Sequence, residues 1–182
     1  VYTRDELQLI GDIACRHDLA ILTDEIYEYI TYSGIEHVSI ASLSDEIKQR
    51  TLTISGFSKT FNMTGWRLGY VSGPAHIIDK MSLVQDLLYV CPVTPLQHAG
   101  INALSISDDY YINMQQAFFK KRQLTVNALN SMGFKFSVPD GAYYILADCQ
   151  SFNKGNSQQT VNYLIEQAKV ATVPGSSFYL DP

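Results

Sequence analysis

Two basic side chains stand near each other in a loop rich in glycine and serine. Lys59 follows a short β-branched segment, residues 51–54, and Arg67 lies eight positions further on, beyond a Thr-Gly turn. A lysine amine can form an imine with an aldehyde when burial or nearby positive charge lowers its pKa. The planar fork of arginine binds a phosphate bidentately and stays charged. The alternatives are a solvated surface lysine and an arginine salt bridge.

A carboxylate, Asp24, follows another short apolar segment, residues 19–22. An apolar run without alternation, coming directly after a helical pattern, is typical of a buried parallel strand. Open α/β sheets bind ligands at the carboxyl ends of their strands, so Asp24 is placed for chemistry. Asp24 could instead cap a turn or helix that begins at Glu25, and both roles are compatible.

Two segments carry a family resemblance. Residues 55–70, SGFSKTFNMTGWRLGY, closely resemble the lysine segment that binds pyridoxal 5′-phosphate (PLP) in class I and II aminotransferases, the fold-type I, aspartate aminotransferase-like family. Residues 22–32, LTDEIYEYITY, resemble the other cofactor-binding strand end of that family. The resemblance covers nearly all of this chain but only part of a family enzyme. We therefore expect a fragment that lacks an N-terminal part and the C-terminal end, and that is inactive alone.

The resemblance implies a role for each candidate residue. Lys59 would hold PLP as a Schiff base and then act as general base and acid. Asp24 would face the ring nitrogen and keep it protonated, so that the ring can act as an electron sink. Tyr27 would donate a hydrogen bond to the phenolic oxygen of the cofactor. Arg67 would anchor the phosphate.

Other polar residues near these positions are weaker candidates. Ser55 and Ser58 could add hydroxyl donors to the phosphate, although Gly56 occupies a position where other family members carry serine. Tyr29 and Tyr32 are expected to serve packing rather than the cofactor. Tyr143 follows a Gly-Ala pair that resembles a substrate-facing segment of the family, but a strand tyrosine more often belongs to a core.

The implied function is that of a PLP-dependent aminotransferase, which moves an amino group between an amino acid and a 2-oxo acid. The partners would be those substrates, and the complete protein is expected to be a homodimer. A PLP-dependent C-S lyase on the same scaffold is an alternative, because the same residues would serve it. A PLP-sensing transcription regulator, with an aminotransferase-like domain joined to a DNA-binding module, is a third hypothesis.

Composition limits the other function classes. The 182 residues are 46% hydrophobic and 17% charged, with a net charge of -5 spread along the chain. This pattern offers no basic stripe for nucleic acid and no basic patch for a membrane. The three cysteines, Cys15, Cys91 and Cys149, form no pairing or zinc motif, so we expect reduced thiols in a cytoplasmic protein and no metal site.

The predicted fold is α/β: the second part of a fold-type I large domain, with a mostly parallel sheet and helices, plus part of a smaller C-terminal α/β domain. We place the large-domain portion at residues 1–107 and the bridging helix with the partial small domain at residues 108–182. The patterns predict helices at 3–16, 74–88, from 94, 107–132 and 158–169, and strands at 19–22, 51–54, 69–72, 134–138, 142–147 and 170–173.

Overall fold

The computed structural model describes residues 1–32 and 34–180, which form two compact units. The first unit contains Val1–Phe118 and the short stretch Asp140–Ala142. The second contains Phe119–Pro139 and the chain from Tyr143 onward. The predicted domain boundary after residue 107 concerns the complete protein and stays a prediction.

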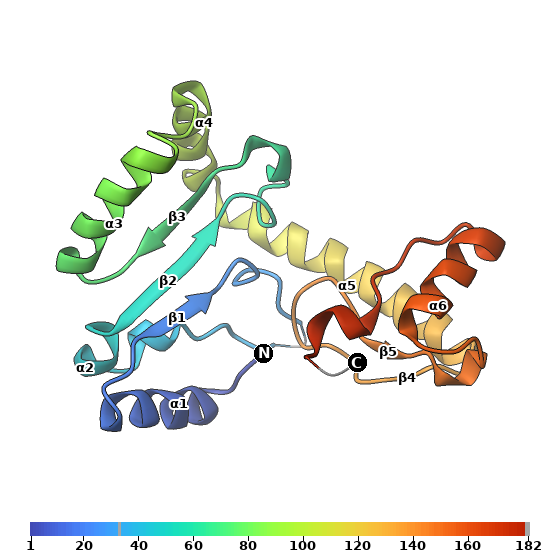
Figure 1. Cartoon of the computed structure of the whole chain (residues 1–182). Helices are drawn as coiled ribbons and strands as arrows, with labels where there is room; N and C mark the ends of the chain where they lie inside the picture. Colours follow the sequence, from blue (N-terminus) through green and yellow to red (C-terminus); the bar gives the residue numbers. More distant parts are fainter. Residues whose placement is uncertain (33, 181–182) are drawn as a thin grey trace. The chain divides into compact units, whose positions relative to one another are not determined.

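The first unit is built around a three-stranded sheet in the order β1-β2-β3. Strand β1 (Ile21–Asp24) pairs in parallel with β2 (Thr51–Gly56), and β2 pairs in antiparallel with β3 (Gly69–Ser72). Helix α1 lies on the β1 side of the sheet, and helices α3 and α4 lie on the β3 side (Figure 1). The remaining bounds are α1 Arg4–Arg16, η1 Ile40–Ser42, α2 Asp45–Lys48, η2 Thr64–Trp66, α3 Ala75–Leu88, α4 Thr94–Leu104 and α5 Asp108–Ser131.

Local sequence signals explain where several elements begin and end. The Thr3 hydroxyl accepts a hydrogen bond from the Glu6 amide, and the Glu6 carboxylate accepts one from the Thr3 amide, so the predicted capping box starts α1. Pro74 precedes α3 and Pro95 stands in the first turn of α4. Gly133, just beyond α5, has φ +78°, the left-handed conformation that commonly follows a helix.

The predicted strand at residues 19–22 is correct in type but displaced, because β1 spans Ile21–Asp24. Its parallel pairing is confirmed by the register, which places Asp24 opposite Ile54. Its expected burial is wrong at Leu22, whose side chain is 68% exposed. Burial alternates along β1, so Leu22 and Asp24 lie on the more exposed of the two faces of this strand.

Residues 140–142 belong to the first unit although they follow part of the second unit in the sequence. Residues 140–142 pair with the segment that follows the Asp24 turn through a bridge between Thr31 and Gly141. The Ala142 amide donates to the Ile30 carbonyl at 2.9 Å, and the Tyr32 hydroxyl donates to the Ala142 carbonyl at 2.6 Å. Ile30 and Tyr32 are buried in one cluster with Met114 of α5. The expected packing role of Tyr32 is therefore confirmed.

The second unit contains less regular structure than the sequence predicts. Strands β4 (Lys135–Phe136) and β5 (Ala147–Asp148) form a short antiparallel pair, η3 spans Gln150–Phe152, and η5 spans Gly175–Phe178. Helix α6 (Ser157–Tyr163) continues into the π-helical segment Leu164–Ala168. The prediction of a strand at residues 170–173 is wrong, because that stretch forms no strand and pairs with none in the structure. Most of the predicted strand at 142–147 is likewise irregular.

Candidate active site

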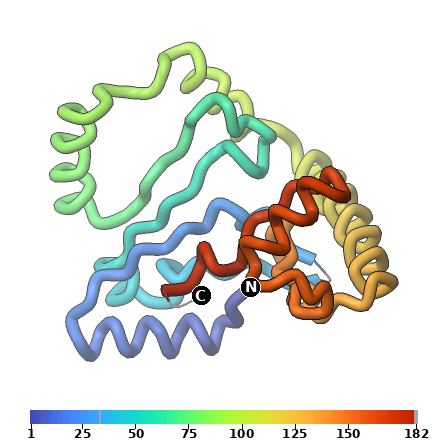
Figure 2. Tube along the Cα trace, turned by 45° about the vertical axis from the view of Figure 1, so that its right-hand side comes forward, coloured from blue at the N-terminus to red at the C-terminus, as the bar shows by residue number. Residues whose placement is uncertain are grey.

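Lys59 lies in the loop that joins β2 to β3, and several hydrogen bonds fix the backbone of this loop. The loop belongs to the teal part of the chain in Figure 2. The Thr64 hydroxyl donates to the Ser58 carbonyl at 2.8 Å, and the Tyr110 hydroxyl donates to the Thr60 carbonyl at 2.7 Å. The residues on both sides of Lys59 are thus held, while Lys59 itself is half-buried.

Side chains of the lysine loop itself form a small hydrophobic cluster with α4. Phe57, Met63 and Leu68 are buried together with Ala103 of α4, and Phe61 packs against them. A Cβ atom placed on Gly100 of α4 would lie 2.8 Å from Leu68 Cδ2 and 3.3 Å from Phe57 Cζ. The absence of a side chain at residue 100 therefore lets α4 approach the loop closely.

Two facing glycines let the strands on either side of the loop meet. Gly56 and Gly69 are cross-strand partners in the β2-β3 pair. A Cβ atom on Gly56 would lie 2.9 Å from both the Gly69 Cα atom and the Leu68 carbonyl oxygen. Gly56 was noted in the sequence as a departure from a family serine, and the structure gives a steric reason for it: a side chain here would require the backbone to move.

Asp24 ends the parallel strand next to β2, and its side chain is exposed. Its carboxylate accepts a hydrogen bond from the Ile26 amide at 3.1 Å, so the proposed turn-capping interaction is present. The backbone amide of the next residue, Glu25, donates to the Ile54 carbonyl at 2.8 Å and continues the pairing with β2. Asp24 therefore stands at the carboxyl edge of the sheet, on the strand adjacent to the one that leads into the lysine loop.

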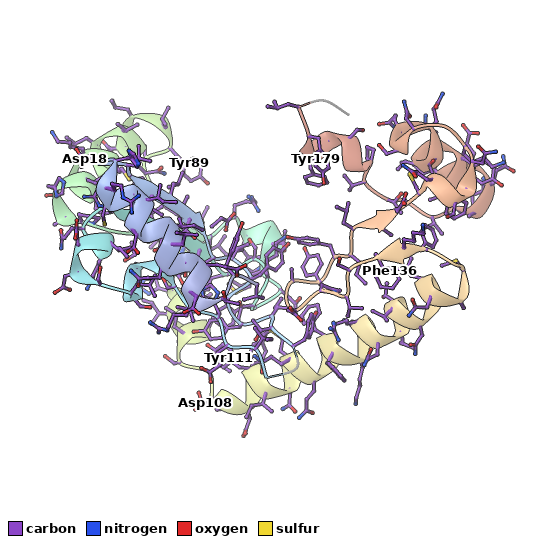
Figure 3. All side chains as sticks on the ribbon, turned by 90° about the horizontal axis from the view of Figure 1, so that it is seen from below. Asp18, Tyr89, Asp108, Tyr111, Phe136 and Tyr179 are labelled. Atoms are coloured by element: carbon purple, nitrogen blue, oxygen red, sulfur yellow. The ribbon has the colours of Figure 1, made fainter. Side chains whose placement is uncertain are left out.

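Tyr27 lies in the turn that follows Asp24, and it faces Lys59. The Lys59 Nζ atom is 5.9 Å from the centroid of the Tyr27 ring. The Glu28 amide donates to the Glu25 carbonyl and the Ile30 amide donates to the Tyr27 carbonyl, which closes the turn. Tyr29 points elsewhere, because its ring packs against that of Tyr111, labelled in Figure 3, at a centroid distance of 4.6 Å.

Arg67 stands at the far end of the lysine loop with an exposed side chain. Its backbone is left-handed, with φ +54°, and its Nη1 atom donates to the Thr64 carbonyl at 2.8 Å. Among the residues that the structure describes, Arg67 forms no ion pair with a carboxylate. The salt-bridge alternative thus finds no support in the described chain, and the guanidinium keeps further N-H donors for an anion.

The two serines differ in their surroundings. Ser55 is 4% exposed, and its hydroxyl donates to Glu28 Oε1 at 2.9 Å. A hydroxyl has one proton, so Ser55 would have to leave Glu28 to donate to a phosphate. Ser58 is half-buried in the loop. Phosphate contacts from Ser55 and Ser58 stay predictions.

Sequence patterns missed two interactions that shape this region. Tyr110 fixes the loop from α5, and burial raises the pKa of its phenol. Glu25 is 6% exposed, and its carboxylate accepts hydrogen bonds from His37 Nε2 at 2.9 Å and from Ser39 Oγ at 3.0 Å. Neither pairing follows from a local pattern, although a glutamate in the buried part of a turn signals a need for partners.

Metal and membrane features are lacking in residues 1–32 and 34–180. No three His, Cys, Asp or Glu side chains in this part of the chain gather in a way that would hold a metal ion. None of its helices combines the length and the hydropathy that a membrane span requires.

The donor groups on the segments near the carboxyl ends of β1 and β2 suit a phosphorylated aromatic aldehyde. An amine, a phenol, a carboxylate and a guanidinium come from Lys59, Tyr27, Asp24 and Arg67, all within residues 24–67 of the first unit. An amine can bind an aldehyde carbon, a guanidinium can bind phosphate, and a carboxylate can pair with a protonated ring nitrogen.

Comparison with known proteins gives the family. The whole chain, residues 1–182, matches the model of the family described as aminotransferase class I and II. The chain belongs to the class I and II aminotransferases, as the two sequence segments predicted. The expected fold is confirmed as well, because solved aminotransferases superpose on the described α/β structure.

Among the relatives, an aromatic-amino-acid aminotransferase 2 from Thermococcus litoralis and an aspartate aminotransferase from Pyrococcus abyssi are each 41% identical over 98% of this chain and 46% of their own length. The structure of an N-succinyldiaminopimelate aminotransferase from Mycobacterium tuberculosis aligns with a TM-score of 0.94 at 31% identity, over all of this chain and 47% of that one. The chain thus spans about half the length of the curated relatives it matches.

Proposed function

We propose that the complete protein is a PLP-dependent aminotransferase that moves an amino group between an amino acid and a 2-oxo acid. The observation that carries this proposal is the position of Lys59 Nζ, 5.9 Å from the Tyr27 ring centroid, in a loop that starts next to the Asp24 strand. Family membership supports the same activity.

Each of the four residues has a task that its chemistry fits. When bound, PLP supplies an electron sink for the charge that develops on the substrate α-carbon. Lys59 would bind the aldehyde carbon of the cofactor through its amine. Asp24 would offer a carboxylate to the protonated ring nitrogen, and Arg67 would bind the phosphate with its exposed guanidinium. Tyr27 would donate a hydrogen bond to the phenolic oxygen.

Lys59 also has the position of a proton carrier. Once a substrate amine has displaced it, the Lys59 amine would be free to take the proton from the substrate α-carbon and to deliver it to the carbon that had carried the aldehyde oxygen of the cofactor. The hydrogen bonds at Ser58 and Thr60 hold the backbone on both sides of Lys59, so only the flexible side chain has to move. The ring of Tyr27 limits the space in which the amine moves.

The proposed partners are amino acids and 2-oxo acids, and the complete protein is proposed to act as a homodimer. Relatives of the chain are named as aminotransferases of aromatic amino acids, aspartate and kynurenine. These amino acids form the first substrate panel. A cytoplasmic location is part of the same proposal.

The test uses the complete protein with PLP, each amino acid of the panel and, for the lyase alternative, an amino acid with a thioether side chain such as cystathionine. An aminotransferase forms a 2-oxo acid from the amino acid only in stoichiometric balance with an added acceptor, such as 2-oxoglutarate. A C-S lyase forms its oxo acid without an acceptor, and a cofactor-sensing regulator forms none. Continuous oxo acid formation in the absence of acceptor, or none in its presence, would therefore refute the proposal.

A further inference from the structure

We propose that Glu28 is a positioning residue that fixes Tyr27 relative to Lys59, because its carboxylate ties the turn after β1 to the two strands that flank the lysine loop. The inference rests on the proposed function, in which Tyr27 and Lys59 act on the same cofactor. Glu28 itself is not proposed to touch the cofactor or the substrate.

The contacts of Glu28 converge on one atom. Glu28 Oε1 accepts a hydrogen bond from Ser55 Oγ at 2.9 Å and a longer one from the Tyr70 hydroxyl at 3.4 Å. Ser55 and Tyr70 are cross-strand partners in the β2-β3 pair. One carboxylate oxygen thus binds the two strands at the same register position.

The two strands, β2 and β3, flank the lysine loop. Ser55 lies on β2, four positions before Lys59, and Tyr70 lies on β3, three positions after Arg67. Glu28 is the residue after Tyr27 in the turn. A shift of the turn relative to the strands would therefore change the distance between the Tyr27 phenol and the Lys59 amine.

The contact between Ser55 and Glu28 is partly buried, whereas the contact between Tyr70 and Glu28 is exposed to solvent. Ser55 is buried, so its hydroxyl has little access to water in place of Glu28. Burial raises the pKa of the Tyr70 phenol, and the nearby carboxylate of Glu28 acts in the same direction, so this hydroxyl keeps its proton and stays a donor. Hydrogen bonds to an ionised acceptor are roughly twice as strong as neutral ones.

Backbone hydrogen bonds around Glu28 also hold the backbone of Tyr27. The Glu28 amide donates to the Glu25 carbonyl at 2.9 Å, and the Ile30 amide donates to the Tyr27 carbonyl at 2.8 Å. The side chain of the neighbouring Ile26 packs near Gly56. A Cβ atom placed on Gly56 would lie 3.5 Å from Ile26 Cδ1. With the turn closed and the Glu28 side chain anchored, the backbone that carries Tyr27 is held in place relative to β2 and β3.

The decisive experiment compares Glu28→Leu, Glu28→Gln, Tyr27→Phe and the double variant Glu28→Leu/Tyr27→Phe in the complete holoenzyme. Glu28→Leu should lower kcat about tenfold, the loss expected from breaking hydrogen bonds to a charged group, with KM changed less than about twofold. The ratio of the two visible absorption bands of the bound cofactor, at one fixed pH, should move in the direction that Tyr27→Phe moves it. Glu28→Gln keeps a carbonyl acceptor and should return kcat to within about threefold of the wild type.

The kcat of the double variant distinguishes a positioning role of Glu28 from a general effect of Glu28 on stability. If Glu28 acts through Tyr27, the double variant should have a kcat within about twofold of that of Tyr27→Phe alone. Multiplied losses in the double variant, or a wild-type band ratio in Glu28→Leu, would overturn the proposal. The matched control is Glu36→Leu, which changes an exposed glutamate of the same chain region and should leave both readouts unchanged.

A second variant keeps the proposal testable if Glu28→Leu does not fold. Tyr70→Phe removes only a hydroxyl from a ring that is 44% exposed, so the fold should persist. It should shift the band ratio in the same direction by a smaller amount and lower kcat about two- to threefold, because the 3.4 Å bond is the weaker of the two. An unchanged band ratio would count against the proposal. The proposed function is tested separately, by borohydride reduction of the wild type, which should leave the cofactor mass on Lys59.

Discussion

The hydroxyl oxygen of Tyr110 lies 2.7 Å from the carbonyl oxygen of Thr60, the residue that follows Lys59. Tyr110 comes from the start of α5, fifty positions further along the chain. The ring of Tyr110 also stacks on that of Phe61, with centroids 5.9 Å apart and planes 13° from parallel. One side chain of the long helix thus fixes both the backbone and an aromatic ring of the lysine loop.

This contact leads to a prediction about alkaline stability. Burial raises the pKa of the Tyr110 phenol in the folded chain, whereas the unfolded chain titrates at about 10. The stability contributed by the protonated phenol is therefore complete below about pH 10 and is lost as the pH rises through the folded-state pKa. In urea unfolding of the complete protein between pH 8 and 11, the free energy of unfolding should fall more steeply for the wild type than for Tyr110→Phe. Equal slopes, with exposed Tyr2→Phe as control, would contradict this assignment.

Replacement of the lysine is the second prediction. Lys59→Ala should abolish the cofactor adduct that borohydride fixes, because no other amine lies in this loop. The fold should persist, since Lys59 is only half-buried and the loop bonds at Ser58 and Thr60 use backbone carbonyls. Mass spectrometry of peptides after reduction gives the measurement. Lys80→Ala, an exposed lysine on α3, is the control and should retain the adduct. An adduct of unchanged yield in Lys59→Ala would assign the amine to another lysine.

The third prediction concerns charge at Asp24. Asn retains the oxygen that accepts the Ile26 amide, so Asp24→Asn should keep the turn and lose only the negative charge. We expect kcat to fall about 100-fold or more, as for the loss of a preorganised electrostatic partner, with a much smaller effect on the yield of the borohydride-fixed adduct. Asp79→Asn on α3 provides an exposed control. Wild-type turnover in Asp24→Asn would remove the ring-nitrogen role.

A pair of glycine substitutions forms the fourth prediction. Gly56→Ala should lower the free energy of unfolding by about 1–3 kcal/mol, because the new methyl group meets backbone atoms at 2.9 Å. Gly65→Ala, in the same loop, places its methyl group in open space and should change stability by no more than about 0.5 kcal/mol. Urea titration of both variants gives the comparison. If Gly56→Ala proved as stable as Gly65→Ala, the close approach of β2 and β3 would not be required.

The sequence predicted features that are encoded within a few residues. The Thr3 and Glu6 capping box, the helix at Ala75–Leu88 and the strand at Gly69–Ser72 follow from neighbouring side chains, and so does the position of Lys59 between two strands. The anchors of the site are different. Glu28 reaches Ser55 across 27 positions and Tyr110 reaches Thr60 across 50, and no local pattern specifies such pairs.

The second unit shows why a short apolar run is ambiguous. The residues at 170–173 have the composition of a strand, but no partner strand pairs with them in the described chain. The preceding π-helical segment ends at Ala168, and Lys169 after it has a left-handed backbone with φ +59°. Strand formation requires a partner as well as a favourable composition, and sequence patterns report only the composition.

The hydrogen bond between Tyr32 and the Ala142 carbonyl spans 110 positions of the chain. Contacts of such separation raise the mean contact order and slow folding, because a long loop must close before they form. During synthesis, the Tyr32 hydroxyl therefore lacks its acceptor until all of α5 and β4 have been made, because Ala142 follows both. The Asp24 turn and the lysine loop can form early in synthesis. The hydrogen bonds of residues 30–32 are complete only after residues 140–142 have been made. The first unit therefore completes its folding late in synthesis. A shorter chain, released before residues 140–142 are made, would leave Ile30 and Tyr32 exposed to chaperones and proteases.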